Sequence, residues 1–291
     1  MQRAEPAFAA VAAHFGRDVD AGLDTIERTV VEARARGARL VVFPECTLGG
    51  YLREPMPGEH GPERPPALDR EGPEIARLIR IAGDTVICAG YTEAAAERPF
   101  SSAVCVSGDG VLGHHRKVHL PPGERFAYAA GERFEAFDTP VGRMGMLICY
   151  DKLFPEAARA LTLDGAQTIA SLAAWPVCRQ RPARQVARDR QTRHFNLTDA
   201  ARAIENQVVW VSANQTGTLG PLRFLGHAKV VDPNGVVLAS TGSRPGLAVA
   251  QVDAAVAVRE SRLGIDHRAD RRPGAYGGPA RMAAANAFEH L

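Results

Sequence analysis

Apolar residues follow two different periods along the chain, and these periods predict where helices and strands lie. Within 18–36, Leu23, Ile26 and Val30 recur at the spacing of an amphipathic helix. The same reasoning predicts further helices over 73–82, 154–164 and about 182–206. Short apolar runs bounded by glycine, proline or charged residues predict strands over 7–11, 40–43, 85–90, 101–106, 111–115, 144–148, 168–172, 208–213 and 246–252.

Two turn sequences predict antiparallel pairing among these strands. Gly108-Asp109-Gly110 is typical of a hairpin turn, and Pro233-Asn234-Gly235 predicts a second hairpin within 229–238. A chain that alternates strands with helices and also contains hairpins favours stacked sheets flanked by helices over a doubly wound parallel sheet. The predicted fold class is therefore α/β, of the α+β type. The sequence contains no GxGxxG or GxxxxGK motif, so a nucleotide site is not predicted.

Two regions of the chain are predicted to be irregular. Residues 51–73 are rich in proline, glycine and charge, which predicts a long excursion loop, and such loops in compact domains often act as lids. The tail from Ser261 lacks a clear period, and we expect it to pack on a partner subunit. We predict a single domain over 1–291, with a core over about 6–255 and a C-terminal tail over about 256–291.

Composition and charge exclude several classes of protein. With 291 residues, 45% hydrophobic and 23% charged, the chain can form a large globular core. The net charge of +2 and the lack of a dense basic run argue against a nucleic-acid partner. The apolar runs are far shorter than the roughly 20 residues that span a bilayer, so no membrane association is predicted. No signal-peptide core is recognisable, and we expect a cytoplasmic protein.

The cysteines and histidines predict neither disulfides nor a metal site. The five cysteines are odd in number, widely spaced and never in a CxxC pair. The close histidines His114, His115 and His119 lack the helical spacing of a zinc motif.

Three reactive side chains come after predicted strands. Glu45 follows the strand over 40–43, Lys117 follows the strand over 111–115, and Cys149 follows the strand over 144–148. A thiol held where a strand gives way to a loop suits a nucleophile, although a single cysteine is more often a small core residue. Glu45 and Lys117, taken one at a time, are also compatible with solvated surface charges. The joint occurrence of all three in this order favours the functional interpretation.

These segments resemble, in order, the glutamate, lysine and cysteine blocks of the nitrilase superfamily of carbon–nitrogen hydrolases. The resemblance covers about 6–276 and rests on Phe43-Pro44-Glu45, His115-Arg116-Lys117-Val118-His119-Leu120, Cys149-Tyr150-Asp151, Phe154-Pro155-Glu156, Arg202-Ala203-Ile204-Glu205-Asn206 and Asp232-Pro233-Asn234-Gly235. It implies a four-layer αββα sandwich that forms a homodimer or a higher homo-oligomer. Two departures are Cys46, where an apolar residue is usual, and His227-Ala228, where relatives usually carry a serine.

The resemblance implies catalytic roles for Glu45, Lys117, Cys149 and a second glutamate, Glu124. Cys149 would attack an amide carbonyl, with the oxyanion held by Lys117 and by the backbone N–H of Tyr150. Glu45 would take the thiol proton, pass it to the leaving amine and activate the water that hydrolyses the thioester. Glu124 would position Lys117 or the substrate. No metal or organic cofactor has a step to perform in this scheme.

The expected substrate is a small molecule bound by residues around Cys149. We predict a pocket with an aromatic wall formed by Tyr51, Tyr150, Phe154 and Trp175. A basic group, Lys152, Arg179 and Arg181, could hold a substrate carboxylate, although loop arginines are more often merely solvated.

Several functions remain open at this point. Tyr150-Asp151 after the cysteine resembles the amide-cleaving branches, whereas nitrile-cleaving relatives usually have Trp-Glu there. We therefore predict an amidase that hydrolyses a small primary amide. An N-carbamoyl hydrolase and a true nitrilase are the alternatives among enzymes, and a non-catalytic interaction protein with the same fold is the alternative outside them.

Overall fold

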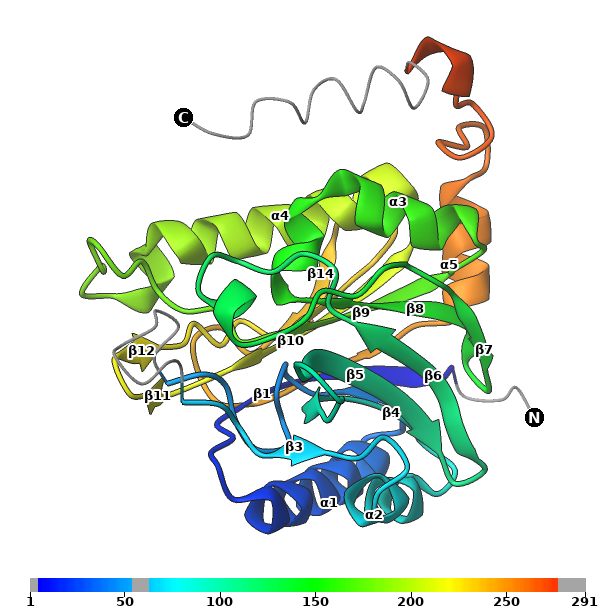
Figure 1. Ribbon diagram of the computed structural model, residues 1–291. Coiled ribbons are helices and arrows are strands. Elements are labelled where there is room, and N and C mark those ends of the chain that lie inside the picture. Colours follow the sequence, from blue (N-terminus) through cyan, green and yellow to red (C-terminus); the bar gives the residue numbers. More distant parts are fainter. Residues whose placement is uncertain (1–4, 54–62, 277–291) are drawn as a thin grey trace.

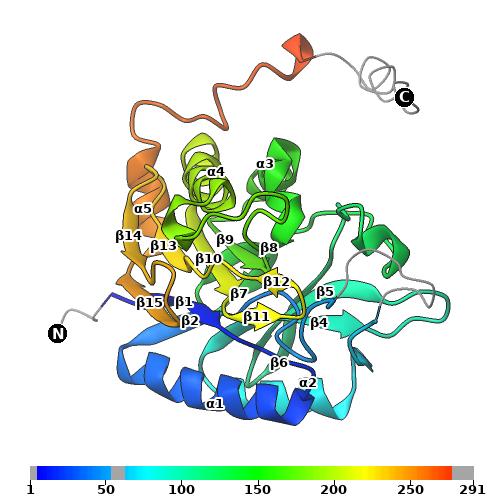
Figure 2. The same cartoon turned by 90° about the vertical axis from the view of Figure 1, so that its left-hand side faces the viewer.

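Four layers, in the order helix, sheet, sheet and helix, make up the fold in the computed structural model, which describes residues 5–53 and 63–276 (Figure 1). Helices α1 and α2 cover one sheet and α3 and α4 cover the other, as the view turned by 90° also shows (Figure 2). The helices of these ranges are α1 (Val19–Ala35), α2 (Pro73–Ala82), α3 (Pro155–Leu163), α4 (Arg190–Asn206) and α5 (Ala254–Ser261). The predicted fold class, a four-layer αββα sandwich, is confirmed.

The two sheet layers are halves of one hydrogen-bonded sheet. The first half contains β6 (Gly110–Arg116), β5 (Phe100–Ser107), β4 (Val86–Glu93), β2 (Ala38–Val42) and β1 (Ala7–Ala13), in that order. The second half continues with β10 (Val209–Gln215), β9 (Thr168–Ala173), β8 (Gly142–Ile148) and β7 (Phe137–Thr139). Strands β1 and β10 pair only at their ends, through Ala12 with Asn214 and Ala13 with Gln215. The sheet can therefore fold over at this short junction.

The remaining strands lie at the margins of these two halves. Strand β15 (Gly246–Gln251) pairs with β1, and the hairpin of β13 (Lys229–Val231) and β14 (Val237–Ser240) pairs with β10. The short strand β3 (Ala67–Leu68) pairs with β4, and β11 (Thr218–Leu219) forms a small separate hairpin with β12 (Leu222–Arg223).

Alternating side chains of the strands separate three hydrophobic cores. In β1, Phe8 and Ala10 face the core between the two sheets, whereas Ala9 and Val11 face the core under α1 and α2. In β8, Ile148 faces the middle core and Leu147 contributes to the third core, under α3 and α4. A shift of one residue in either strand would exchange its two faces, so burial on both faces fixes the register.

Most predicted elements are confirmed, including both hairpins. One prediction needs correction, and the short strands β3, β7, β11 and β12 were not predicted. The fourth helix begins at Arg190, not near residue 182, because Asp189 caps it and accepts hydrogen bonds from the backbone N–H of Cys178, Ala183 and Gln191. The preceding segment is thereby held as a loop. Helix α5 was not predicted, although Asp253 caps it by accepting from Val256.

The C-terminal segment of the described chain is tethered to the sandwich by Gln207. Its side-chain amide nitrogen donates to the backbone oxygens of Ser261 and Ile265, and its oxygen accepts from the backbone N–H of His267. Residues 54–62 of the predicted lid, and the tail beyond residue 276, lie outside the described residues. No helix within 5–53 and 63–276 is long and apolar enough to cross a membrane.

Candidate active site

Glu45, Lys117 and Cys149 leave their strands at the same edge of the sandwich. Strands β2 and β8 run in the same direction, because β2, β1, β10, β9 and β8 form an unbroken series of parallel pairs. Strand β6 has this direction too, since two antiparallel steps separate it from β4, which is parallel to β2. The carboxyl ends of parallel strands meet at one edge of a sheet. The topology itself therefore brings the three side chains together.

Cys149 lies on a sharp turn at the end of β8. Its backbone φ of 49° is a left-handed conformation that residues other than glycine rarely adopt. The chain passes there into the 3₁₀ turn Cys149–Leu153. Cys149 is only 7% exposed, yet it lines a cavity. Backbone strain of this kind persists where the surrounding structure over-determines it, and it is common at functional sites.

Glu45 is fixed by hydrogen bonds on both carboxylate oxygens. Its Oε1 accepts from Lys117 Nζ at 2.7 Å and from Ser101 Oγ at 3.4 Å, and its Oε2 accepts from the backbone N–H of Ala174 at 3.0 Å. Strand β4 passes close behind it, because a Cβ atom at Gly90 would lie 2.8 Å from the Glu45 Cα. Only glycine allows this close approach.

Lys117 lies between two carboxylates. Its Nζ donates to Glu45 Oε1 and to Glu124 Oε1, both at 2.7 Å, and all three side chains are at most 1% exposed. Glu124 Oε1 also accepts a hydrogen bond from the Tyr51 hydroxyl. The second oxygen, Glu124 Oε2, has no hydrogen-bond partner among the described residues.

Burial and neighbouring charges determine the protonation of this site. Burial alone would lower the pKa of Lys117, but Glu124 and Glu45 outweigh it and raise that pKa well above its ordinary value. Burial raises the pKa of Glu124 to about 7, with Lys117 opposing the rise and Glu45 adding to it. Burial, and then Glu45, raise the pKa of Cys149 well above its ordinary value, and Lys117 opposes them. At neutral pH the site therefore holds a protonated Lys117 and a neutral thiol, which needs a base to become a nucleophile.

A buried carboxylate, Asp151, joins the segment that carries Lys117 to the segment that carries Cys149. Asp151 Oδ1 accepts from the backbone N–H of His119 at 2.8 Å and lies 3.0 Å from its Nδ1. Asp151 Oδ2 accepts from the backbone N–H of Ile148 at 3.1 Å and lies 3.1 Å from His115 Nε2. Burial alone would raise the pKa of Asp151, but the hydrogen bonds from His115 and His119 hold it well below its ordinary value. His115, His119 and Asp151 all belong to the sequence motifs described above, but the sequence did not predict that they are in contact.

A cavity of about 310 Å³ opens above Cys149. Its lining includes Tyr51, Glu124, Cys149, Tyr150, Trp175 and Arg179. Trp175 is held at the cavity wall by its backbone N–H, which donates to Asn214 Oδ1 at 2.7 Å, and by its indole N–H, which donates to Gln191 Oε1 at 3.0 Å. The walls are predominantly apolar, and they also include Pro121, Pro122, Pro176 and Leu222, which no sequence motif marks.

Three residues expected in this wall lie elsewhere in the described structure. Phe154 packs edge-on against Tyr150 and stacks on His119, behind the wall. Lys152 is fully buried and pairs with Asp199 at 2.8 Å, so it does not belong to a basic rim. Arg181 is absent from the lining, and Arg179 alone of the expected basic group contributes to it.

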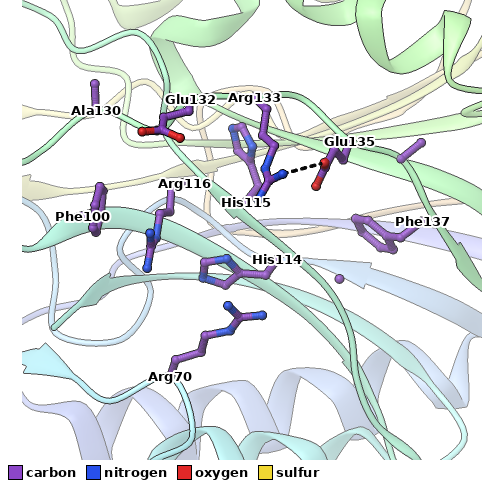
Figure 3. A pocket seen from close by; sticks show the side chains of 13 residues that line it. Arg70, Phe100, His114, His115, Arg116, Ala130, Glu132, Arg133, Glu135 and Phe137 are labelled. Carbon is purple, nitrogen blue, oxygen red and sulfur yellow. Dashed lines mark ion pairs between the residues drawn. The ribbon is translucent and has the colours of Figure 1, made fainter. Parts of the chain in front are cut away.

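A second cavity, of about 410 Å³, is lined by residues of β6, the strand that leads to Lys117, and by residues between Ala130 and Phe137 (Figure 3). Its charges are largely paired. Arg116 and His114 both contact Glu93, at 2.6 and 3.0 Å, and Arg133 pairs with Glu135 at 3.3 Å. None of Glu45, Lys117 and Cys149 lines it, so the candidate site is the smaller, apolar cavity. Within the described ranges, no group of three or more His, Cys, Asp or Glu residues is placed to hold a metal ion.

Comparison with known proteins gives consistent results for sequence and for structure. The profile of the family described as carbon-nitrogen hydrolase matches residues 8–260. A protein named nitrilase from Pyrococcus abyssi is 32% identical over 248 residues, which cover 84% of this chain and 87% of the relative. An N-carbamoylputrescine amidase from Solanum tuberosum is 29% identical over 276 residues, with 89% of both chains covered.

Among solved structures, an amidase from Nesterenkonia sp. superposes with a TM-score of 0.75 at 25% identity. The match covers 95% of this chain and 97% of the amidase. In a variant of that amidase, the acetamide moiety of fluoroacetamide is added covalently to the active-site cysteine.

Proposed function

Because this chain belongs to the carbon–nitrogen hydrolase family, we propose that it hydrolyses a small primary amide through a thioester on Cys149. It is a hydrolase that acts on amides, and the resemblance to the nitrilase superfamily inferred from its sequence is confirmed. One observation carries the finer proposal. Lys117 is bound by Glu45 and Glu124, and Cys149 and Glu124 line the same apolar cavity.

The first chemical step is the attack of Cys149 on the amide carbonyl. The thiol is neutral because its pKa is raised, so Glu45 accepts its proton as attack proceeds. Lys117, with its pKa raised, stays charged throughout the pH range of ordinary assays. Its ammonium and the backbone N–H of Tyr150 stabilise the oxyanion. Loss of one such donor typically lowers kcat by about 10²–10³-fold.

The second half of the reaction reuses Glu45. The protonated carboxyl gives its proton to the leaving nitrogen, and ammonia departs from the tetrahedral intermediate. Glu45 then takes a proton from water, which attacks the thioester. The carbon–sulfur bond breaks, Glu45 returns the proton to the leaving thiolate, and the carboxylic acid is released. Glu124 holds Lys117 in place through Oε1, and its free Oε2 is available to accept an N–H from the substrate amide.

The cavity supports a short, apolar substrate body. Its walls are contributed by Tyr51, Trp175 and Leu222 together with prolines. Each methylene that is buried contributes about 0.8 kcal/mol, or roughly a fourfold gain in kcat/KM, until the cavity is full. An N-carbamoyl compound is the second candidate, because relatives named N-carbamoylputrescine amidase align over 89% of this chain.

Ammonia release from matched substrates tests this proposal. The panel consists of an aliphatic primary amide, its nitrile, its N-carbamoyl counterpart and its ω-carboxylated amide. We expect the highest kcat/KM for the uncharged amide and a far lower value for the nitrile. A nitrile that equals or exceeds its amide would overturn the amidase assignment.

Arg179 allows a separate test of charge selectivity. It is the one arginine of the expected basic group that lines the cavity, and it makes no ion pair with any described residue. If the ω-carboxylated amide is preferred, Arg179→Ala should abolish that preference. Arg181→Ala is the matched control, since Arg181 does not contribute to the cavity lining.

We also propose that the protein forms a homodimer through the outer face of α3 and α4. Leu197 and Ile204 are 64% and 43% exposed and lie two helical turns apart, on one face of α4. Leu163 at the end of α3 is 46% exposed. Light scattering should show a dimer that Leu197→Glu converts to a monomer. Val31→Glu, on the opposite helical layer and 60% exposed, is the matched control and should leave the dimer intact.

A further inference from the structure

A second cluster of buried charges lies beside the active site. Lys152 Nζ donates to Asp199 Oδ1 at 2.8 Å, and Lys229 Nζ donates to Asp199 Oδ2 at 2.6 Å. The indole N–H of Trp210 donates to the same carboxylate at 2.9 Å. All three charged side chains are at most 3% exposed. The mechanism proposed above uses none of them.

Aromatic rings surround the two ammonium groups of this cluster. Lys152 Nζ lies 3.2 Å and Lys229 Nζ lies 4.2 Å from the centroid of the Phe195 ring. Lys152 Nζ also lies 5.1 Å from the centroid of Trp175, which lines the cavity above Cys149. Cation–π contacts of this kind stabilise a desolvated cation. The cluster is therefore a built feature that touches the wall of the active site.

The two buried clusters have opposite formal charge. Lys152, Lys229 and Asp199 together carry one excess positive charge. Lys117, Glu45 and Glu124 carry one excess negative charge when both carboxylates are ionised. An uncompensated buried charge is costly, and opposite charges interact strongly in a medium of low polarity. The cluster of Lys152, Lys229 and Asp199 is therefore a buried source of net positive charge behind the cavity wall.

Lys152 is the member closest to the nucleophile along the chain. It lies three residues after Cys149, within the same 3₁₀ turn, Cys149–Leu153. Arg202 fixes this turn, because its Nε donates to the Lys152 backbone oxygen at 2.8 Å and its Nη2 to that of Leu153 at 3.1 Å. The ammonium is thus held at a constant position relative to the thiol.

We propose that Lys152 is a positioning residue of the active site, whose buried positive charge acts through the Cys149 turn and Trp175 to favour the ionised form of Cys149. It does not touch the substrate. The inference rests on the proposed role of Cys149 as the nucleophile. It adds a second cation, behind the cavity wall, to the one supplied by Lys117.

The charged and titratable groups that face Lys152 come from several elements. They are Asp199 from α4, Lys229 from β13 and Cys149 from its own turn. Arg202 from α4 binds the Lys152 backbone oxygen, and His227 lies beside Lys229 and Asp199. Burial lowers the pKa of Lys152 to about 8, with Asp199 opposing and Lys229 adding to this effect. The ammonium is therefore charged at neutral pH and loses its charge as the pH rises through about 8. Cys149 becomes harder to ionise as this happens.

The pH dependence of Cys149 alkylation tests the proposal directly. Wild-type protein and Lys152→Met are reacted with iodoacetamide across a pH series, and peptide mapping follows Cys149 alone. Lys152→Met leaves Asp199 bound by Lys229 and Trp210, so a balanced ion pair remains buried. Lys152 is charged only below about pH 8, so we expect Cys149 of Lys152→Met to be alkylated about tenfold more slowly than that of wild type below this pH, and the two rates to converge at higher pH.

Lys229→Met is the matched control, because it removes the same charge from the same carboxylate but from another strand. This variant leaves Lys152 paired with Asp199. It should change the alkylation profile by less than a third of the change that Lys152→Met produces. If Lys152→Met does not fold, Lys152→Gln keeps a donor for Asp199 and is read in the same way. An unchanged profile in the Lys152 variant, or equal shifts in both variants, would overturn the proposal.

This experiment is independent of amide turnover. Alkylation requires no substrate, so the profiles can be measured even if the proposed amidase activity is absent. Failure of the proposed function would be recognised differently, by the absence of amide hydrolysis in wild type or by its persistence in Cys149→Ala.

Discussion

Replacing Asp151 with asparagine should separate the Lys117 segment from the Cys149 segment with little change in shape. The carboxylate accepts from two backbone N–H groups and two histidine rings, at 2.8 to 3.1 Å. An asparagine keeps one acceptor oxygen and presents an NH₂ donor where the other oxygen was. One backbone N–H and one histidine N–H then face the NH₂ donor of the asparagine. The histidine on that side can change tautomer, but the backbone N–H of His119 or of Ile148 cannot.

The size of this effect follows from those contacts. One buried backbone donor left unsatisfied costs about 1–3 kcal/mol, and the lost charge-assisted bonds add a similar amount. We therefore expect Asp151→Asn to lower the free energy of unfolding by about 2–4 kcal/mol. A displacement of about 1 Å between catalytic groups can cost 10²-fold in rate, so we expect kcat to fall by about 10–100-fold with a much smaller change in KM.

Urea unfolding and steady-state kinetics at several pH values provide the assay. The folded-state pKa of Asp151 is depressed, so its contribution to stability is present above the unfolded pKa of about 3.9 and is lost as the pH falls toward the folded pKa. The stability difference between wild type and Asp151→Asn should therefore be constant above about pH 5 and shrink at lower pH. Asp253→Asn, at the cap of α5, is the matched control and should leave kcat unchanged. A kcat within threefold of wild type in Asp151→Asn would refute the reasoning.

Three further predictions concern the catalytic residues, the pH dependence of stability and the effect of a metal chelator. Glu45→Gln and Lys117→Ala should each lower kcat by orders of magnitude, and adding either to Cys149→Ala should change little, since residues that act as a unit are not additive; additive losses would show that they act separately. The pKa of Glu124 is raised to about 7, so its contribution to stability is full below its unfolded pKa and is lost as the pH rises through 7. Unfolding experiments should therefore show wild type losing on the order of 3 kcal/mol between about pH 4 and pH 8, and Glu124→Gln should lack this slope. Prolonged treatment with a metal chelator should leave amide hydrolysis unchanged, and a loss of activity restored by zinc would contradict a mechanism based on Cys149, Glu45 and Lys117.

The sequence predicted those parts of the fold that local patterns determine. The periods of apolar residues located the longer strands and the first three helices, because burial on a defined face leaves a regular trace. The start of α4 was predicted too early, since the carboxylate that caps it also binds Cys178 and Ala183, and such contacts leave no period. Helix α5 has only eight residues, too few for a convincing pattern.

Short sequence motifs predicted one part of the candidate site. The other part depends on contacts between residues far apart in the chain, and the sequence did not predict it. Glu45, Lys117 and Cys149 were marked by their position after strands. Lys152 was assigned to a basic rim, because its partner Asp199 lies 47 residues further along the chain. Phe154 was assigned to the pocket wall, whereas its ring stacks on His119, whose backbone position depends on Asp151.

Mass spectrometry of the enzyme, acid-quenched during turnover of an amide, tests the central claim most directly. The account predicts an acyl group on the peptide that contains Cys149, with the mass of the substrate minus ammonia. Cys149→Ala should show neither the adduct nor ammonia release, although it remains folded. Steady ammonia release by the Cys149→Ala variant, or an acyl group on another residue, would contradict the account.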